Sequence, residues 1–232
     1  MTHHSPSPAT FDTAVLDIDG TLVDSVYAHV WSWREAFRTV GLDVPTWKIH
    51  RAIGMGGDQL VRAVAGADVE ESLGDEVRGR QSDLYTDLSQ HLVATRGATG
   101  LLEALKARGL AVVLASSGAR EDTDRSVALL EADPYLDATI SGDDTEATKP
   151  HDEPVSRAVA AVGGTHALVV GDSVWDMESA GRAGHAAVGL LSGGISRHEL
   201  LAAGALGVYD DPAGLTAALP DLVGDVGEDD GQ

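Results

Sequence analysis

Short apolar runs alternate with amphipathic segments along the second half of the chain, from residue 96 onward. The apolar runs are rich in Val, Leu and Ala, and the segments between them carry apolar residues at helical spacing. The expected strands are "LAVVLAS" (110–116), "ATIS" (138–141), "HALVVG" (166–171) and "AAVGLL" (186–191), and the expected helices cover 100–108, 120–131, 153–162 and 174–183. Strands that alternate with helices in this way predict a parallel sheet with crossover helices.

The first apolar run, "TAVLDI" at residues 13–18, has the character of these strands although a long helical block follows it. That block begins with "SVYAHVWSWREAFRTVG", in which apolar residues such as Val26, Val30 and Trp33 recur at helical spacing. The expected fold class is therefore α/β, with a Rossmann-like parallel sheet as the core and a helical domain inserted after the first strand.

The boundaries of these parts follow from the changes in pattern. We expect residues 11–23 and 96–219 to form the α/β core and residues 24–95 to form the insertion. Residues 1–10 are polar and rich in Pro, and residues 220–232 are acidic, so both ends are expected to be solvated tails without fixed structure.

The charge of the chain argues against nucleic acids as partners. The 232 residues include 37 acidic and 16 basic ones, for a net charge of −21. Such a surface repels the phosphates of nucleic acids, and no stripe of Lys or Arg offsets it. A site for a small phosphorylated molecule would have to reverse this field locally, with a metal ion, a lysine or backbone amides.

The chain carries no cysteine, no secretory signal and no apolar run near the ~18 residues of a membrane span. These features exclude disulfides and thiolate metal sites, and they favour a cytoplasmic protein with no membrane partner. The oligomeric state cannot be read from the sequence.

Polar residues follow the expected strands at the ends where ligands of open parallel sheets bind. Asp17 and Asp19 are two residues apart, so on an extended chain their side chains leave on the same face. The other such residues are Ser116, Ser117, Lys149 and Asp172. Carboxylates this close repel one another unless a cation, a shared proton or a reaction requires them together.

Four stretches, in this order, resemble the haloacid dehalogenase superfamily, in particular its phosphatases with a helical cap. They are "DIDGTLVDS", "VLASSG", "TKP" and "VVGDSVWDMESAGRAG". The resemblance spans about residues 11–210. It implies that the helical insertion is a cap domain over an active site at the edge of the sheet.

The resemblance implies a catalytic role for four residues. Asp17 would be the nucleophile that becomes an aspartyl-phosphate, and Asp19 the general acid and base. Ser116 would bind the phosphoryl oxygens, and Lys149 would neutralise negative charge. Ser117 is a second candidate for substrate contact, or it satisfies the turn.

The resemblance also implies a Mg²⁺ site. Its ligands would be the side chain of Asp17, the backbone carbonyl of Asp19 and the side chain of Asp172, with Asp176 in support. A hard cation with oxygen ligands fits the chemistry, because a carboxylate that attacks an anionic phosphate faces repulsion. We expect neighbouring carboxylates to raise the pKa of Asp19, which must carry a proton in the first step.

The insertion holds further candidates. His29 could face the substrate, as in similar sugar-phosphate mutases, or could be structural. The loop "IGMGGDQL" (53–60), which includes Gly57, could contact substrate or only join two helices. Asp24 and Ser25 are interpreted as helix caps. The tryptophans at 31, 33 and 47 are interpreted as packing residues.

The expected function is that of a Mg²⁺-dependent phosphatase for a small metabolite that is a phosphate monoester, such as phosphoglycolate or a sugar phosphate. The alternative is a mutase like β-phosphoglucomutase. The phosphate-binding cap arginine of that mutase would align near Gly57, where this chain has no cation, and Arg51 or Arg62 could compensate. A non-catalytic binding module is disfavoured, because all the expected catalytic residues are present.

Overall fold

The computed structural model describes residues 11–223, which contain a six-stranded sheet whose neighbouring strands are all parallel. The strands are β1 (Thr13–Leu16), β2 (Ala111–Ala115), β3 (Ala138–Ile140), β4 (Ala167–Gly171), β5 (Ala186–Leu190) and β6 (Val208–Tyr209). Their order is β3-β2-β1-β4-β5-β6, so the winding reverses at β1. In open parallel sheets, such a switch point is where ligands bind.

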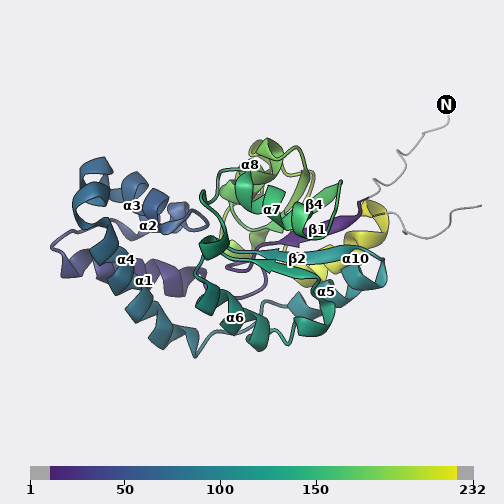
Figure 1. The fold of residues 1–232 in the computed structure, drawn as a ribbon, viewed down its shortest axis with the longest axis horizontal. Helices are drawn as coiled ribbons and strands as arrows, with labels where there is room; N and C mark the ends of the chain where they lie inside the picture. The colour runs from purple at the N-terminus through teal and green to yellow at the C-terminus, as the bar shows by residue number, and fades with distance from the viewer. Residues whose placement is uncertain (1–10, 224–232) are drawn as a thin grey trace, which may run out of the picture.

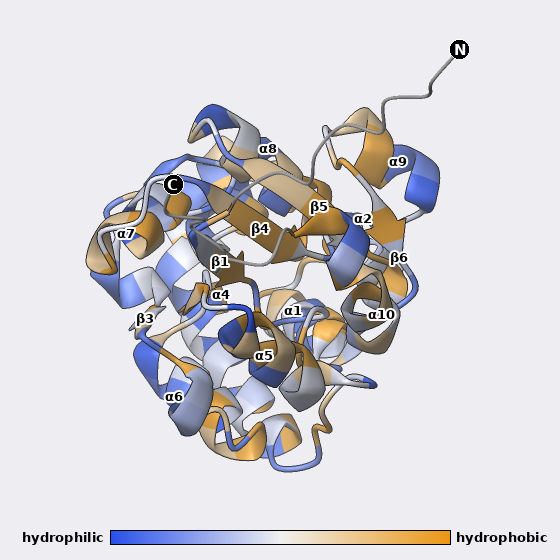
Figure 2. Ribbon diagram, turned by 90° about the vertical axis from the view of Figure 1, so that its right-hand side faces the viewer, coloured by the Kyte–Doolittle hydropathy of each residue, from blue (hydrophilic) through white to orange (hydrophobic). Residues whose placement is uncertain are grey.

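Helices cover both faces of the sheet (Figure 1). The helices of this part are α5 (Ala98–Ala107), α6 (Arg120–Leu129), α7 (Glu153–Ala161), α8 (Val174–Arg182), α9 (Arg197–Ala202) and α10 (Pro212–Leu222). In Figure 1, α7 and α8 lie above the strands, and α5 and α6 lie below them. Figure 2 shows β4 and β5 as hydrophobic strands between these layers.

The two faces of the sheet belong to two hydrophobic clusters, because successive side chains of a strand point to opposite sides. Leu16 packs with residues of α5 and α10, whereas its neighbour Val15 packs with residues of α7 and α8. Both side chains are at most 1% exposed. Burial on both faces explains why these strands appear in the sequence as continuous apolar runs.

The insertion after β1 forms four helices around a hydrophobic cluster of their own. They are α1 (Val26–Thr39), α2 (Thr46–Ala52), α3 (Gly57–Ala65) and α4 (Ala67–Ser89). In the view of Figure 1 they lie to the left of the sheet. The two chain segments that join them to the sheet run side by side. Asp24 N–H donates to the Val93 carbonyl (3.0 Å), and Thr95 N–H donates to the Leu22 carbonyl (3.0 Å).

The remaining regular structure consists of short 3₁₀ turns. These turns are η1 (Asp133–Tyr135), η2 (Gly142–Asp144) and η3 (Leu191–Gly193). No helix within residues 11–223 is long and apolar enough to cross a membrane.

The α/β class is confirmed, and the structure differs from the expected elements in three places. The first strand ends at Leu16 rather than at residue 18, although Asp17 adds one more backbone hydrogen bond to β4. The two-residue strand β6 and the helices α9 and α10 were not predicted. Helix α10 runs to Leu222, past the expected start of the acidic tail at 220, because Leu219 and Val223 are buried against the core. The expected tail of residues 1–10 and the rest of the C-terminal tail, 224–232, lie outside the described residues.

Asp12 ties the start of β1 to the turn before β4. Its carboxylate accepts hydrogen bonds from Thr165 N–H (2.8 Å), Thr165 Oγ1 (2.6 Å), His166 N–H (3.1 Å) and Thr13 Oγ1 (2.7 Å). Burial raises the pKa of Asp12, but the hydrogen bonds outweigh burial and lower the pKa from 3.8 to about 2. The ionised form therefore stabilises the folded state.

We predict that Asp12→Asn lowers the free energy of unfolding by about 1 kcal/mol near neutral pH, a value discounted for partial solvent exposure. Because the folded pKa lies below the unfolded one, this contribution is complete above about pH 4 and is lost as the pH falls toward about 2. Urea unfolding of both proteins at several pH values measures the difference. A difference that stays constant down to about pH 3, or one matched by Asp43→Asn at an exposed position, would contradict the prediction.

Candidate active site

The parallel register places the expected site residues side by side at one edge of the sheet. Leu16 pairs with Leu114 on β2 and with Val170 on β4, so the residues that follow these strands are neighbours. Asp17 extends the ladder by one step, because its N–H donates to the Val170 carbonyl (2.9 Å). Asp172 is the first residue after β4.

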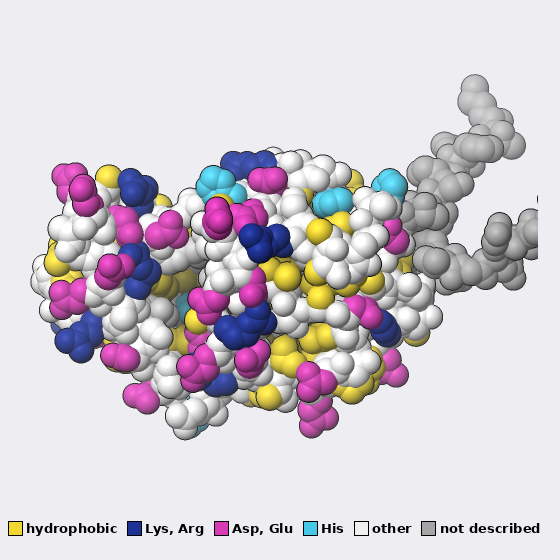
Figure 3. Space-filling model, viewed as in Figure 1, with side chains coloured by type: hydrophobic (Ala, Val, Ile, Leu, Met, Phe, Trp, Pro, Cys, Tyr) yellow, Lys and Arg dark blue, Asp and Glu magenta, His cyan; other side chains and the backbone are white. Residues whose placement is uncertain are grey.

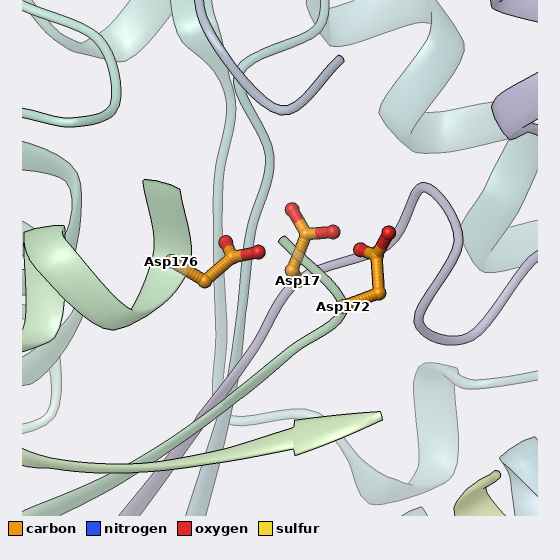
Figure 4. A group of neighbouring side chains, drawn as sticks. All are labelled: Asp17, Asp172 and Asp176. Carbon is orange, nitrogen blue, oxygen red and sulfur yellow. The ribbon is translucent and has the colours of Figure 1, made fainter. Parts of the chain in front are cut away.

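Three carboxylates meet at this edge (Figure 4). Asp17, Asp172 and Asp176 are buried, and each offers an oxygen atom within 4.8 Å of the others. Asp176 lies in the first turn of α8, where its Oδ2 accepts hydrogen bonds from Ser173 N–H (3.1 Å) and Ser173 Oγ (2.6 Å). The capping interaction therefore fixes Asp176 and leaves its Oδ1 directed at the group.

Lys149 lies against the same carboxylates. Its ammonium donates to Asp17 Oδ1 and to the Ala115 carbonyl (3.1 Å), and it forms an ion pair with Asp176 Oδ1 at 2.8 Å. The residue is 2% exposed. Burial lowers the pKa of Lys149, but the charges of Asp17 and Asp176 outweigh burial and hold the pKa above its ordinary value. Lys149 is therefore positively charged inside the protein.

The charges of this group do not balance without a further cation. Three carboxylates against one ammonium leave two negative charges when all are ionised. Burial raises the pKa of Asp17 to about 7 and raises the pKa of Asp172 well above its ordinary value, and the neighbouring carboxylates add to both effects. A divalent cation would supply the missing charge and favour the ionised forms.

The donor set also fits such a cation. Asp176 Oδ1 is buried, and its contact with Lys149 lacks hydrogen-bond geometry. Thr21 Oγ1 donates to Asp172 Oδ1 (3.1 Å), which orients that carboxylate. Carboxylate oxygens at this spacing suit a hard cation such as Mg²⁺ or Ca²⁺.

Two glycines make room for the Asp172 carboxylate. A Cβ at Gly193 would lie 1.6 Å from Asp172 Oδ2, and one at Gly20 would lie 2.5 Å from the same atom. Gly20 also has a φ of +80°, which disfavours other residues there. Gly193 does not have a left-handed backbone, so position 193 requires Gly only because a Cβ there would collide with Asp172.

Asp19 is partly buried and turns toward the insertion instead of toward the three carboxylates. Its Oδ1 accepts a hydrogen bond from Ser25 Oγ (2.5 Å) and lies 3.1 Å from His29 Nε2. Burial raises the pKa of Asp19, but His29 and Ser25 outweigh burial and lower it. The expected rise in this pKa is therefore wrong for the free site. Ser25 does precede α1, but its side chain binds Asp19 and makes no capping hydrogen bond.

His29 faces the site, which favours the functional interpretation of this residue. Its ring stacks on Tyr85 with centroids 3.8 Å apart, and its Nδ1 lies 3.4 Å from Gln81 Nε2. These contacts hold the imidazole at Asp19.

The two serines after β2 differ in surroundings. Ser116 is 4% exposed, and its Oγ accepts a hydrogen bond from Gly118 N–H (3.0 Å). Ser117 faces the insertion, where its Oγ donates to the Gly54 carbonyl (3.2 Å). Of the two, Ser117 lines the cavity described next, and Ser116 directly follows β2.

A cavity of about 200 Å³ lies between the insertion and the sheet edge. Figure 3 shows a hollow between these two parts of the molecule. Asp17, Asp19, His29 and Gly57, all expected from the sequence, line this cavity. The expected loop of residues 53–60 supplies more of its wall.

Several lining residues were not expected from the sequence. They are Trp33, Arg78, Gln81, Ser82 and Asp122. Arg78, Gln81 and Ser82 recur at intervals of three and four in α4, so helical periodicity marks them as one face. Trp33 is buried as predicted but also faces the cavity, whereas the tryptophans at 31 and 47 are 47% and 66% exposed and do not pack in the core.

The two arginines that were considered as substitutes for a mutase's cap arginine lie elsewhere. Arg51 pairs with Glu199 near α9, and neither Arg51 nor Arg62 lines the cavity.

The sequence profile of haloacid dehalogenase-like hydrolases matches residues 11–184. The chain belongs to this hydrolase family. A similar relative is a phosphoglycolate phosphatase of Caulobacter vibrioides, 31% identical, with 83% of this chain and 84% of the relative aligned. A validoxylamine A 7'-phosphate phosphatase of Streptomyces hygroscopicus subsp. limoneus is 26% identical and covers 78% of this chain and 86% of its own length.

A solved structure extends the likeness to three dimensions. A hydrolase from Pseudomonas syringae superimposes with a TM-score of 0.87 at 33% identity, covering 93% of this chain and all of that one. The sheet order and the helical insertion of this chain are therefore those of a known hydrolase of similar size.

In this haloacid dehalogenase-like hydrolase, we predict that Gly193→Ala weakens divalent cation binding about tenfold or more, because the new methyl group must displace the Asp172 carboxylate. The increase in melting temperature during a titration with the cation measures the apparent affinity. Gly181→Ala, which places a methyl group in open space on α8, is the matched control. Equal affinities of the two variants would show that Asp172 does not hold the cation.

Proposed function

We propose that this hydrolase is a Mg²⁺-dependent phosphatase that hydrolyses a small phosphate monoester through an aspartyl-phosphate on Asp17. The observation that carries the proposal is the buried carboxylate of Asp17, which lies between those of Asp172 and Asp176 and is paired with the Lys149 ammonium. The relatives named as phosphatases support it.

Four residues carry the chemistry. Asp17 attacks phosphorus, forming a phosphorus–oxygen bond to its carboxylate while the bond to the ester oxygen breaks. Asp19 gives its proton to the leaving oxygen. It then takes a proton from the water that attacks the phosphorus of the aspartyl-phosphate, which releases inorganic phosphate and restores the Asp17 carboxylate. Lys149 reduces the repulsion between Asp17 and the phosphate, and Ser116 binds a phosphoryl oxygen with backbone N–H groups of its loop.

The contact between Asp19 and His29 bears on this exchange of protons. In the free site His29 and Ser25 favour the carboxylate form of Asp19, as their effect on its pKa shows. That form is the base of the second step. The arrival of a phosphate dianion beside Asp19 raises its pKa, which favours the protonated form that the first step needs.

Mg²⁺ would be held by the side chains of Asp17 and Asp172 and the backbone carbonyl of Asp19, with Asp176 in support. When bound, it supplies positive charge at the oxygens of the phosphate. The two negative charges that Lys149 leaves unbalanced when all three carboxylates are ionised support this assignment.

We also propose that residues 24–95 act as a cap domain that moves over the cavity. The paired segments at 22–24 and 93–95 are the only covalent links between cap and core and would form the hinge. Closure would exclude bulk water during transfer to Asp17. The partner is a small phosphorylated metabolite, and a cytoplasmic location remains a prediction from the sequence.

We predict that Asp17→Asn lowers the rate of p-nitrophenyl phosphate hydrolysis in Mg²⁺ by about 10³-fold or more, because an amide cannot act as the nucleophile. Asp43→Asn is the matched control, since Asp43 is an exposed carboxylate outside the cavity and the hinge. Release of p-nitrophenol measures both. Equal activity of wild type and Asp17→Asn would eliminate the assignment of Asp17.

The mutase alternative keeps one supporting observation, the contact of His29 with Asp19. Such a mutase needs a cation in its cap to bind phosphate. Among the described residues that line the cavity, Arg78 is the one Lys or Arg, and its guanidinium is engaged by Glu70 and Asp75. Interconversion of β-glucose 1-phosphate and glucose 6-phosphate without net release of phosphate would establish a mutase. We expect release of phosphate instead.

A further inference from the structure

The cavity beyond Asp17 and Asp19 is where the leaving group of the substrate would lie. Its volume of about 200 Å³ is below the range typical of drug-sized ligands, so it fits a small molecule. One wall is apolar and is made by Trp33, Ile53, Met55 and Leu60. A carbon skeleton can pack against this wall while its polar groups face the other residues.

The positive charge available to that leaving group is already neutralised. Arg78 is the one Lys or Arg among the described residues that line the cavity. Its Nη1 donates to both carboxylate oxygens of Glu70 (2.6 and 2.8 Å), and its Nη2 donates to Asp75 (2.6 Å). The Glu70 side chain is only 11% exposed, so solvent screens this pair little. The Asp75 side chain is fully exposed, so Glu70 is the partner that neutralises Arg78 at the cavity.

Apart from Arg78 and His29, the ionisable side chains of the described residues that line the cavity are carboxylates. Asp122 lines it with a carboxylate whose Oδ1 accepts a hydrogen bond from Arg125 Nη2. Gln81 also lines the cavity, and its Nε2 donates to Ser32 Oγ (3.1 Å). Ser82 adds a hydroxyl. A carboxylate or phosphate group can only accept, whereas a hydroxyl group can donate to these oxygens.

We propose that this cavity selects phosphate monoesters of neutral polyhydroxy alcohols, of the sugar or cyclitol kind, and rejects esters whose leaving group carries a carboxylate or a second phosphate. The inference rests on the proposed phosphatase function and specifies its substrate class. A second anion would lie near the carboxylate of Asp19, while the one Lys or Arg among the described lining residues, Arg78, is already paired with Glu70. Placing like charges together without a free cation is costly. Hydroxyl groups meet the same oxygens as donors.

Two pairs of esters that differ in one group test the proposal. They are 2-hydroxyethyl phosphate with 2-phosphoglycolate, and glycerol 3-phosphate with 3-phosphoglycerate. Each pair exchanges a hydroxymethyl group for a carboxylate on the same skeleton. Phosphate release at saturating Mg²⁺ gives kcat/KM for each ester. We expect the hydroxyl member of each pair to exceed its carboxylate partner by about tenfold or more.

Glu70→Gln tests the neutralised guanidinium, and Glu71→Gln is the matched control. Both variants remove one negative charge from α4, but the Glu71 side chain is exposed and makes no hydrogen bond to Arg78. Glu70→Gln should lower the ratio of kcat/KM of the hydroxyl ester to that of its carboxylate partner about threefold, because Arg78 can then attract the carboxylate. Glu71→Gln should leave the ratio unchanged. A ratio is insensitive to the fraction of folded enzyme, so partial misfolding of a variant does not obscure it.

The outcomes separate this inference from the function on which it rests. Equal rates within each pair, or faster hydrolysis of the carboxylate members, would overturn the substrate class while the phosphatase function stands. Equal ratios in Glu70→Gln and Glu71→Gln would overturn the role of the Glu70–Arg78 pair. No hydrolysis of these esters or of p-nitrophenyl phosphate would overturn the phosphatase function itself, and the substrate class with it.

Discussion

The site depends on the ion pairs that the buried ammonium of Lys149 forms with Asp17 and Asp176. Asp17, Asp172 and Asp176 lie within 4.8 Å of one another without exposure to solvent, an arrangement that repulsion would disrupt in the absence of positive charge. Lys149 provides part of that charge, and it is fixed by the Ala115 carbonyl as well as by the two carboxylates. The charge that Lys149 leaves unbalanced when all three carboxylates are ionised supports the proposed cation site.

The sheet positions these charges, and the insertion completes the cavity above them. Three contacts between the two parts involve residues 50–54 of the insertion. The Ser117 hydroxyl donates to the Gly54 carbonyl, Trp175 Nε1 donates to the Arg51 carbonyl (3.2 Å), and His50 Nε2 lies 2.9 Å from the Gly193 carbonyl oxygen. Since Gly193 also makes room for Asp172, the docked position of the insertion and the geometry of the carboxylates share one loop.

The sequence was sufficient to predict the α/β class, the family resemblance and the strands from β1 to β5, because parallel strands buried on both faces appear as apolar runs. Asp17 and Asp172 could be named from the sequence because parallel strands bring the residues at their carboxyl ends to one edge of the sheet, and the two do lie together there. Their proposed roles in catalysis remain predictions. The strand β6 has only two residues and leaves no periodic pattern.

The rest of the site depends on how the insertion docks, which local patterns do not encode. Arg78 and Gln81 share a helix face, but which face of α4 meets the cavity is decided by packing against α1 and α3. The Ser25 hydroxyl binds Asp19 instead of capping α1, and this too depends on a contact outside the helix.

The claim that Asp17 receives the phosphoryl group is tested most directly by trapping. The enzyme is quenched during turnover of a phosphate ester with Mg²⁺ and treated with borohydride, which reduces an acyl phosphate to the alcohol, so that aspartate becomes homoserine. Mass spectrometry of the peptide that contains residue 17 should find homoserine at that position only when both ester and metal were present. Unmodified Asp17 in an enzyme that releases phosphate, or homoserine at another aspartate, would contradict the account.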